Sequence, residues 1–143
     1  MKNIIRIITV LILAGSFTFT ACKSPSPEEQ EVIAVVKENL QTFEKEDFEA
    51  HMKTIHEESA IYEQTKNTVK LIMNQYDLKF ELEDVEVLEL AADEAQVRYV
   101  QTTKKIDGPE FKNNRVKGVH TLKKFNGDWK LFSSAIENIE YLD

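Results

Sequence analysis

The hydrophobic pattern of this chain changes period once, near Asp77, and that change limits the fold more than any other feature. Before it, apolar residues recur every three or four positions, which is the spacing of an amphipathic helix. After it, apolar and polar residues alternate, which is the spacing of a half-buried strand. Helices therefore precede strands. We expect an α+β domain, with N-terminal helices packed on a curved four-stranded antiparallel sheet.

Three helices are expected in the first part of the chain. Ser26 can cap the first, because Pro27 follows at the first helical position and Glu29 completes a capping box. Its apolar stripe comprises Val32, Ile33, Val36, Leu40 and Phe43. Asp47 and Ser59 can cap a short second helix and a third helix. Their stripes comprise Phe48, Met52 and Ile55, and then Tyr62, Val69, Ile72 or Met73, and Tyr76.

Four strands are expected in the second part. The alternation of the first strand slips by one residue near Asp84, which predicts a β-bulge. The Asn126-Gly127 pair supplies the positive φ angles of a two-residue hairpin turn between the last two strands. The other three strands are expected at about 94–106, about 116–125, and from 129 towards 139 or 141.

The first 21 residues have the features of a secretory signal peptide. Lys2 and Arg6 make the start positive, and an apolar stretch from Ile7 leads to the small residue Ala21. The alternative is an uncleaved transmembrane helix, which needs about 20 predominantly apolar residues. The stretch is shorter and is interrupted by threonine, glycine and serine. We therefore predict a cleaved signal peptide at residues 1–21.

The single cysteine of the chain, Cys22, lies where this signal peptide should end. Residues 19–22, Phe-Thr-Ala-Cys, resemble the bacterial lipobox, in which a small residue precedes a cysteine that receives diacylglycerol. The lipobox usually has leucine where this chain has Phe19. The resemblance implies a lipoprotein anchored through Cys22, with residues 22–27 as lipidated cysteine and short tether. The domain, residues 28–143, is then expected outside the cytoplasm, on a cell membrane or outer membrane.

The charge and the histidines exclude some classes of partner. The formal net charge is −7, and cleavage after Ala21 would also remove two positive charges. Such an acidic surface repels nucleic acid, so no nucleic-acid partner is predicted. His51 and His56 are five residues apart, whereas helical metal ligands are spaced by three or four. We predict no metal and no cofactor, and we expect both histidines to be solvated near a helix end.

Two stretches of the chain resemble the nuclear transport factor 2-like superfamily, which includes SnoaL-like proteins. The first is the late hairpin Asn-Gly-Asp-Trp-Lys-Leu at 126–131, and the second is the acidic helix exit at 43–52. The resemblance covers about residues 28–142, and a cystatin-like roll is the alternative fold. It implies a conical cavity between sheet and helices, used by different members for catalysis, ligand binding or protein contact. It also implies a homodimer formed sheet to sheet.

Candidate cavity residues follow from this resemblance. Asp84 and His120 are candidates for an acid–base pair, with Tyr99 polarising a carbonyl, as in the ketosteroid-isomerase-like members. Core packing explains the aromatic residues equally well. The candidates for a ligand pocket are Tyr62, Tyr76, Tyr99, His120 and Trp129.

No motif brings these acid–base candidates together, and this favours a non-catalytic function. We expect a membrane-tethered domain of the cell envelope that binds a small apolar ligand or a partner protein. Two alternatives remain open: an isomerase- or cyclase-like enzyme, and a structural or assembly factor that acts through its sheet face. Convergence of Asp84, His120 and a tyrosine in the cavity would favour the enzyme.

Overall fold

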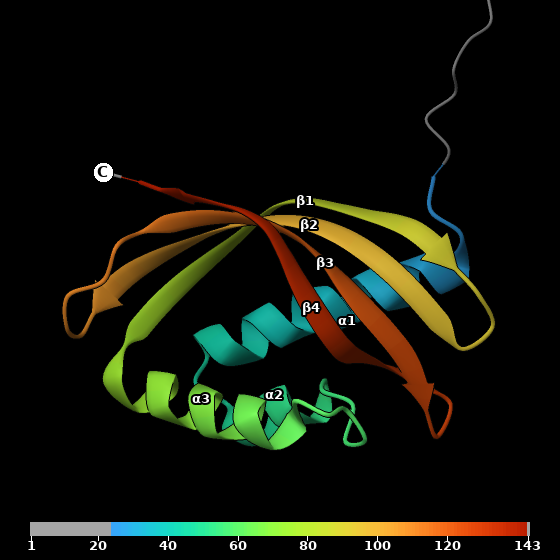
Figure 1. Cartoon of the computed structure of the whole chain (residues 1–143), viewed down its shortest axis with the longest axis horizontal. Helices are drawn as coiled ribbons and strands as arrows, with labels where there is room; N and C mark the ends of the chain where they lie inside the picture. Colours follow the sequence, from blue (N-terminus) through green and yellow to red (C-terminus); the bar gives the residue numbers. More distant parts are fainter. Residues whose placement is uncertain (1–23, 143) are drawn as a thin grey trace, which may run out of the picture.

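The computed structural model of the chain describes residues 24–142, so the predicted signal peptide and Cys22 lie outside the described residues. The helices are α1 (Pro27–Glu44), α2 (Phe48–Lys53) and α3 (Tyr62–Gln75). The strands are β1 (Asp77–Leu90), β2 (Glu94–Asp107), β3 (Asn114–Phe125) and β4 (Asp128–Tyr141). They form one antiparallel sheet in chain order. In Figure 1 the sheet is an arch with the helices on its concave side, which confirms the predicted fold class.

The first two helices begin where the sequence predicts. The Glu29 N–H donates to the Ser26 hydroxyl at 3.2 Å, and the Ser26 N–H donates to the Glu29 carboxylate at 2.6 Å. Together with Pro27 at the helix start, this is the predicted capping box. Asp47 caps α2 by accepting a hydrogen bond from the Ala50 N–H at 3.0 Å.

The predicted cap of the third helix is wrong. The residue at the N-cap of α3 is Ile61, and no side chain caps this helix. The Ser59 hydroxyl instead donates to the Phe132 carbonyl on β4 at 2.6 Å. A partly buried carbonyl is usually paired with a donor, and here a residue distant in sequence supplies it. This long-range hydrogen bond, which local sequence cannot show, holds Ser59 against the sheet.

The predicted irregularities of the sheet are confirmed. In the pairing of β1 with β2, Leu82 lies opposite Gln101 and Asp84 lies opposite Val100, so Glu83 is the extra residue of a bulge. At the β3–β4 turn, Asn126 has a φ of 54° and Gly127 a φ of 93°. Both angles suit the two-residue hairpin turn that this sequence favours.

The hydrophobic core lies at the end of the sheet nearest this hairpin, and we call this region the closed end. Its buried members are Val32, Val36, Met52, Ile55, Ala95, Val97, Leu122, Trp129 and Leu131. Residues 54–59 close its side by pairing with the outer edge of β4. The Leu131 N–H donates to the Thr54 carbonyl, and the His56 N–H donates to the Leu131 carbonyl, each at 2.8 Å. Core and edge are thus both covered here.

Candidate functional site

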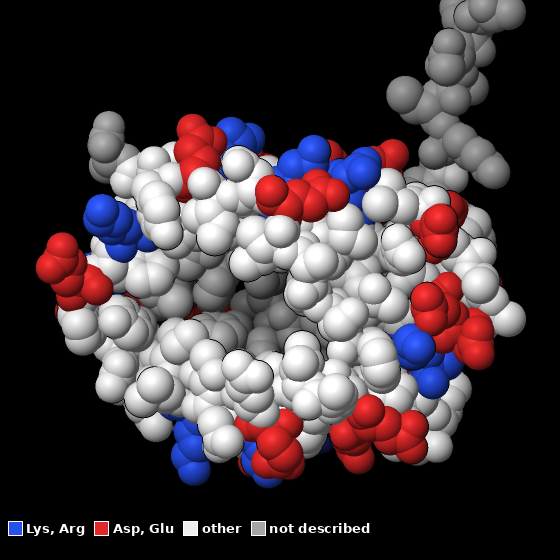
Figure 2. All heavy atoms as spheres, viewed as in Figure 1, with Lys and Arg blue, Asp and Glu red and all other residues white. Residues whose placement is uncertain are grey.

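A hollow of about 360 Å³ lies between the helices and the sheet, beyond the closed end. Seven of its lining residues are apolar: Leu40, Phe43, Ile72, Leu78, Phe80, Phe111 and Val116. The others are polar: Asn39, His51, Tyr99, Gln101, Thr103, Asn114 and His120. Within the described residues, no aspartate, glutamate, lysine or arginine lines it. Figure 2 shows the hollow in the middle of one face, with the charged side chains lying away from its mouth.

Tyr99 and His120 form a stacked pair in this hollow. Their ring centroids are 4.0 Å apart and their planes differ by 10°. Gly118 lies opposite Tyr99 in the sheet, and a Cβ atom there would come within 2.8 Å of the Tyr99 hydroxyl oxygen. The tyrosine ring therefore lies flat across β3 because position 118 carries no side chain. On its other side, His120 Nδ1 is 2.6 Å from the Ser134 hydroxyl oxygen.

Burial keeps both rings of this pair uncharged at neutral pH. It lowers the pKa of His120 to about 4, because the charged imidazolium loses water. The same loss of water raises the pKa of the Tyr99 hydroxyl, which stays protonated. The pair therefore offers hydrogen-bonding groups without charge.

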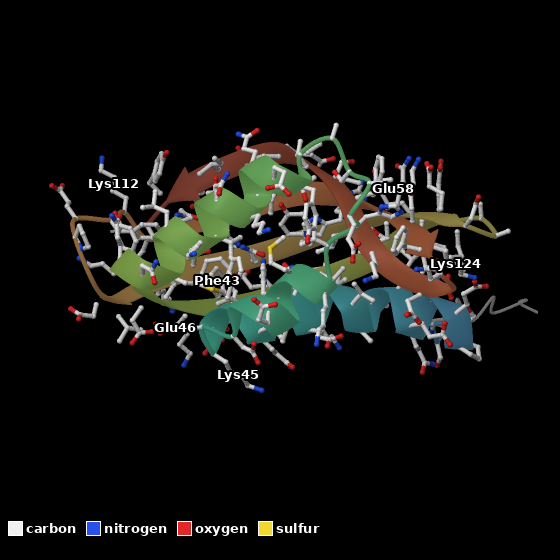
Figure 3. The ribbon with its side chains drawn as sticks, turned by 90° about the horizontal axis from the view of Figure 1, so that it is seen from below. Phe43, Lys45, Glu46, Glu58, Lys112 and Lys124 are labelled. Carbon is white, nitrogen blue, oxygen red and sulfur yellow. The ribbon has the colours of Figure 1, made fainter. Side chains whose placement is uncertain are left out.

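His51 is a second neutral histidine at the hollow. Its Nδ1 lies 2.9 Å from the Asn39 carbonyl oxygen, which can only accept, so Nδ1 carries the proton and Nε2 is an acceptor. Burial lowers the pKa of His51, and the hydrogen bond to the Asn39 carbonyl opposes this in part. The Phe43 ring meets His51 edge-on at 5.2 Å. In Figure 3, Phe43 lies on the inner side of α1, whereas Lys45 lies on the outside.

The prediction that His51 and His56 are solvated is wrong, because each is only 4% exposed. His56 lies between the rings of Phe125 and Phe132, at 5.0 and 5.2 Å. The apolar stripe of α2 includes Phe48, three residues before His51, so helical spacing could have indicated the burial of His51. The burial of His56 depends on two distant strands.

The structure does not bring Asp84 and His120 together. Asp84 lies opposite Val100 on β1 and is exposed, in a groove between α1 and β1 that Lys37 also lines. His120 lies two strands away on β3 and faces the hollow. Two strand spacings are roughly 10 Å, beyond the reach of a hydrogen bond even through one water. The hollow therefore gives His120 no carboxylate partner among the described residues.

The remaining pocket candidates lie elsewhere. Tyr62 packs against the core of the closed end. Tyr76 contacts the Phe111 ring at 5.9 Å, and Trp129 is buried in the core beneath the Lys124 ammonium at 4.8 Å. Of the five predicted pocket residues, the hollow is lined by Tyr99 and His120.

The other polar lining residues of β2 were not predicted from the sequence. Gln101 and Thr103 have the same parity as Tyr99, so strand alternation could have placed them on the same face. In residues 24–142, no group of three or more histidine, cysteine or acidic side chains could hold a metal ion. No helix of this same part of the chain is long and apolar enough to cross a bilayer.

Solved structures of low sequence identity share the fold. An NTF2-like protein from Cytophaga hutchinsonii matches with a TM-score of 0.67 at 14% identity, covering 78% of this chain and 98% of that one. A putative scytalone dehydratase from Novosphingobium aromaticivorans matches with 0.65 at 14% identity, covering 81% and 88%. A protein of unknown function with a cystatin-like fold, from Nostoc punctiforme, matches with 0.61 at 16% identity, covering 78% and 91%. These similarities confirm the predicted NTF2-like, cystatin-like architecture.

By sequence, the chain is similar to a narrower group of proteins than those that share its fold. Anti-sigma-I factor RsgI9 of Acetivibrio thermocellus is 32% identical over 109 residues, which are 76% of this chain. The chain spans only 15% of the length of that relative. The family model described as Anti-sigma-I factor RsgI9, C-terminal domain, matches residues 34–142, which include all four strands and most of α1. The chain therefore belongs to the family of anti-sigma-I factor RsgI9 C-terminal domains.

Proposed function

We propose that this protein is a non-catalytic, membrane-tethered regulatory domain of the cell envelope that binds a small, uncharged, largely apolar molecule. The observation that carries the proposal is the hollow, whose described lining contains no charged side chain at neutral pH. Its volume of about 360 Å³ suits a small molecule. A charged ligand would lose its hydration there without gaining an ionic partner, which is costly.

The polar groups of the hollow can orient a bound ligand, which apolar contacts alone do not do. His51 Nε2 is an acceptor, because Nδ1 already donates to the Asn39 carbonyl. The Tyr99 hydroxyl is a donor that stays protonated. A ligand with one hydroxyl group on an apolar body could donate to the first and accept from the second.

The regulatory part of the proposal rests on family membership. The matched relative is named as an anti-sigma factor, and this chain matches a minor part of its length. We infer that the domain serves a regulatory system by sensing a molecule outside the cytoplasm. Binding of a partner protein in place of a small molecule is the alternative.

The tether is proposed from the lipobox resemblance at Cys22. The helix α1 begins at Pro27, so the folded domain starts within a few residues of that cysteine, each spanning at most about 3.5 Å. Two acyl chains would anchor it stably, because each buried methylene contributes roughly 0.8 kcal/mol. Substitution Cys22→Ser should move the protein from the membrane fraction to the soluble fraction. Unchanged fractionation would refute lipid anchoring.

A neutral solvatochromic dye, Nile red, tests the hollow. We expect a blue-shifted, saturable signal with the purified protein, and at least a tenfold weaker affinity for Val116→Phe, which fills the hollow. The matched control is Val119→Phe on the same strand, whose side chain faces the opposite side of the sheet and should leave affinity unchanged. Equal affinity in both variants would refute the hollow as the site and favour a protein partner.

The predicted homodimer through the sheet stays a prediction. The outer face of the sheet carries ion pairs, among them Arg98–Glu86 at 3.3 Å and Lys104–Glu81 at 4.0 Å. A dimer on this face would have to desolvate these pairs, which weakens the contact. Sedimentation at high protein concentration checks it, and a monomer there would count against the dimer.

A further inference from the structure

The outer edge of β4 is covered along its first part and open along the rest. Residues 54–59 pair with the edge at Leu131, and the Ser59 hydroxyl satisfies the Phe132 carbonyl. From residue 134 to residue 141, every residue of β4 is exposed. Among residues 24–142, no segment pairs with the outward side of this stretch. An edge of this length and exposure is a template for another strand.

The open stretch presents apolar side chains on the face of the hollow. Ile136, Ile139 and Tyr141 are 59%, 44% and 65% exposed. They lie opposite Gly118, Val116 and Asn114 of β3. Directly opposed residues of an antiparallel pair share a face, and Val116 and Asn114 line the hollow. The three side chains therefore extend the wall of the hollow to the sheet edge, where a further strand would cover them.

We propose that β4 residues 134–141 bind an extended segment of a partner protein as a fifth strand, with alternating apolar and basic side chains. The apolar side chains would lie over Ile136 and Ile139, on the side of the hollow. Backbone hydrogen bonds would hold the segment, and alternate side chains would select it. This site adjoins the ligand site proposed in the hollow, but its β4 residues are not among those that line the hollow.

The charges of the opposite face select a basic partner. Glu140 lies on this face, opposite Arg115 of β3. Glu137, the extra residue of a bulge in β4, lies on the same face and forms an ion pair with Lys117. Glu137 is shared by two cations, Arg98 at 3.9 Å and Lys117 at 3.8 Å. Within the described residues, Glu140 has no ion pair. A lysine or arginine on the added strand would lie beside Glu140.

The same charges disfavour a second copy of this chain on the edge. Pairing of β4 with β4 would bring Glu137 and Glu140 of both copies along one seam, and like charges on neighbouring strands destabilise the pairing. The formal charge of −7 on each copy adds to this repulsion. A basic strand from another protein has neither difficulty.

A short synthetic peptide of alternating valine and lysine is the probe, added to the purified full chain. We expect saturable binding that slows amide hydrogen exchange of residues 134–141 at least tenfold. A peptide of alternating valine and glutamate, and a valine–lysine peptide with alternate backbone nitrogens methylated, should each bind at least tenfold more weakly. The first control tests charge, and the second tests the backbone hydrogen bonds.

Two variants and a control locate the site. Ile139→Ser should weaken binding of the valine–lysine peptide about tenfold. Ile106→Ser, which alters an exposed isoleucine at the end of β2, should leave this affinity unchanged. Glu140→Lys should reverse the preference towards the valine–glutamate peptide. Nile red binding by Glu140→Lys, whose changed side chain lies on the face away from the hollow, reports that the hollow persists, so a change in peptide binding is separable from loss of the ligand site. Circular dichroism and urea unfolding of Ile139→Ser report that its fold persists.

Three results would overturn the proposal. The first is an absence of valine–lysine peptide binding to a folded chain. The second is equal binding of the methylated peptide, which would show that backbone pairing is not involved. The third is protection of the amides of residues 134–141 from hydrogen exchange without peptide. Protection that increases with protein concentration would show that a second copy covers the edge.

Discussion

The two ends of one sheet differ in what covers them. At the closed end, Val97 and Leu122 are fully buried beneath α1, and residues 54–59 seal the edge of β4. At the other end, which we call the open end, the same strands carry Tyr99 and His120 on the same face. These two residues line the hollow. The strands continue unbroken from one end to the other. The difference therefore comes from the covering segments, because the seal on β4 ends at Phe132.

This difference separates stability from binding within one small domain. Burial of apolar surface contributes roughly 25 cal/mol per Å², so the closed end supplies most of the stabilisation. The open end keeps polar groups such as His51 and Tyr99 at a cavity, and exposes apolar side chains at its rim. Binding regions are commonly drawn from the less stable parts of a fold.

The largest expected effect is the loss of a core side chain at the closed end. Leu122→Ala should lower the free energy of unfolding by about 3 kcal/mol, because it removes a fully buried side chain and leaves a cavity. The matched change at the open end, Ile139→Ala, should cost less than about 0.5 kcal/mol. Urea unfolding measures both. Similar losses for the two variants would show that the two ends contribute equally to stability.

An intermediate effect on stability is expected at Gly118, where the Tyr99 ring lies against β3. Gly118→Ala places a Cβ atom 2.6 Å from the Ala135 carbonyl oxygen and 2.8 Å from the Tyr99 hydroxyl oxygen. We expect a loss of about 2 kcal/mol, as is usual for overpacking. Thermal unfolding measures it. Adding Tyr99→Leu should restore only part of the loss, since the contact with the backbone carbonyl remains. Full restoration would show that the tyrosine ring alone requires glycine.

The smallest effect is a pH dependence from the open end. The pKa of His120 is about 4 in the folded protein, and about 6.5 in the unfolded chain. Its contribution is therefore constant above pH 6.5 and is lost as pH falls towards 4, because the unfolded chain binds the proton first. Since His120 is only partly buried, we expect a loss of about 1–2 kcal/mol in the free energy of unfolding.

The variant His120→Gln isolates this contribution. The free energy of unfolding of both proteins is measured at pH 7 and pH 4.5. The two proteins share His51 and the carboxylates, so the effects of these groups cancel in the difference between the proteins. The variant should lose about 1 kcal/mol less than the wild type over this interval. Identical pH dependence would mean that His120 remains well hydrated, and the hollow would then be more polar than the structure indicates.

Local signals in the sequence determined the elements and the fold class. The capping box at Ser26, the bulge near Asp84 and the turn at Asn126-Gly127 were all predictable, because each depends on residues adjacent in the chain. The change of hydrophobic period predicted helices followed by a sheet, because side-chain alternation follows directly from backbone geometry.

Only the tertiary structure decided which side chains meet. Ser59 hydrogen-bonds Phe132 instead of capping α3, and His56 lies between rings of two strands. It also placed Tyr99 beside His120 and kept Asp84 apart from both. These outcomes depend on contacts between segments distant in the chain, and on how far residues 54–59 cover β4. No local pattern encodes such distances, because they arise when the covering segments pack against the sheet.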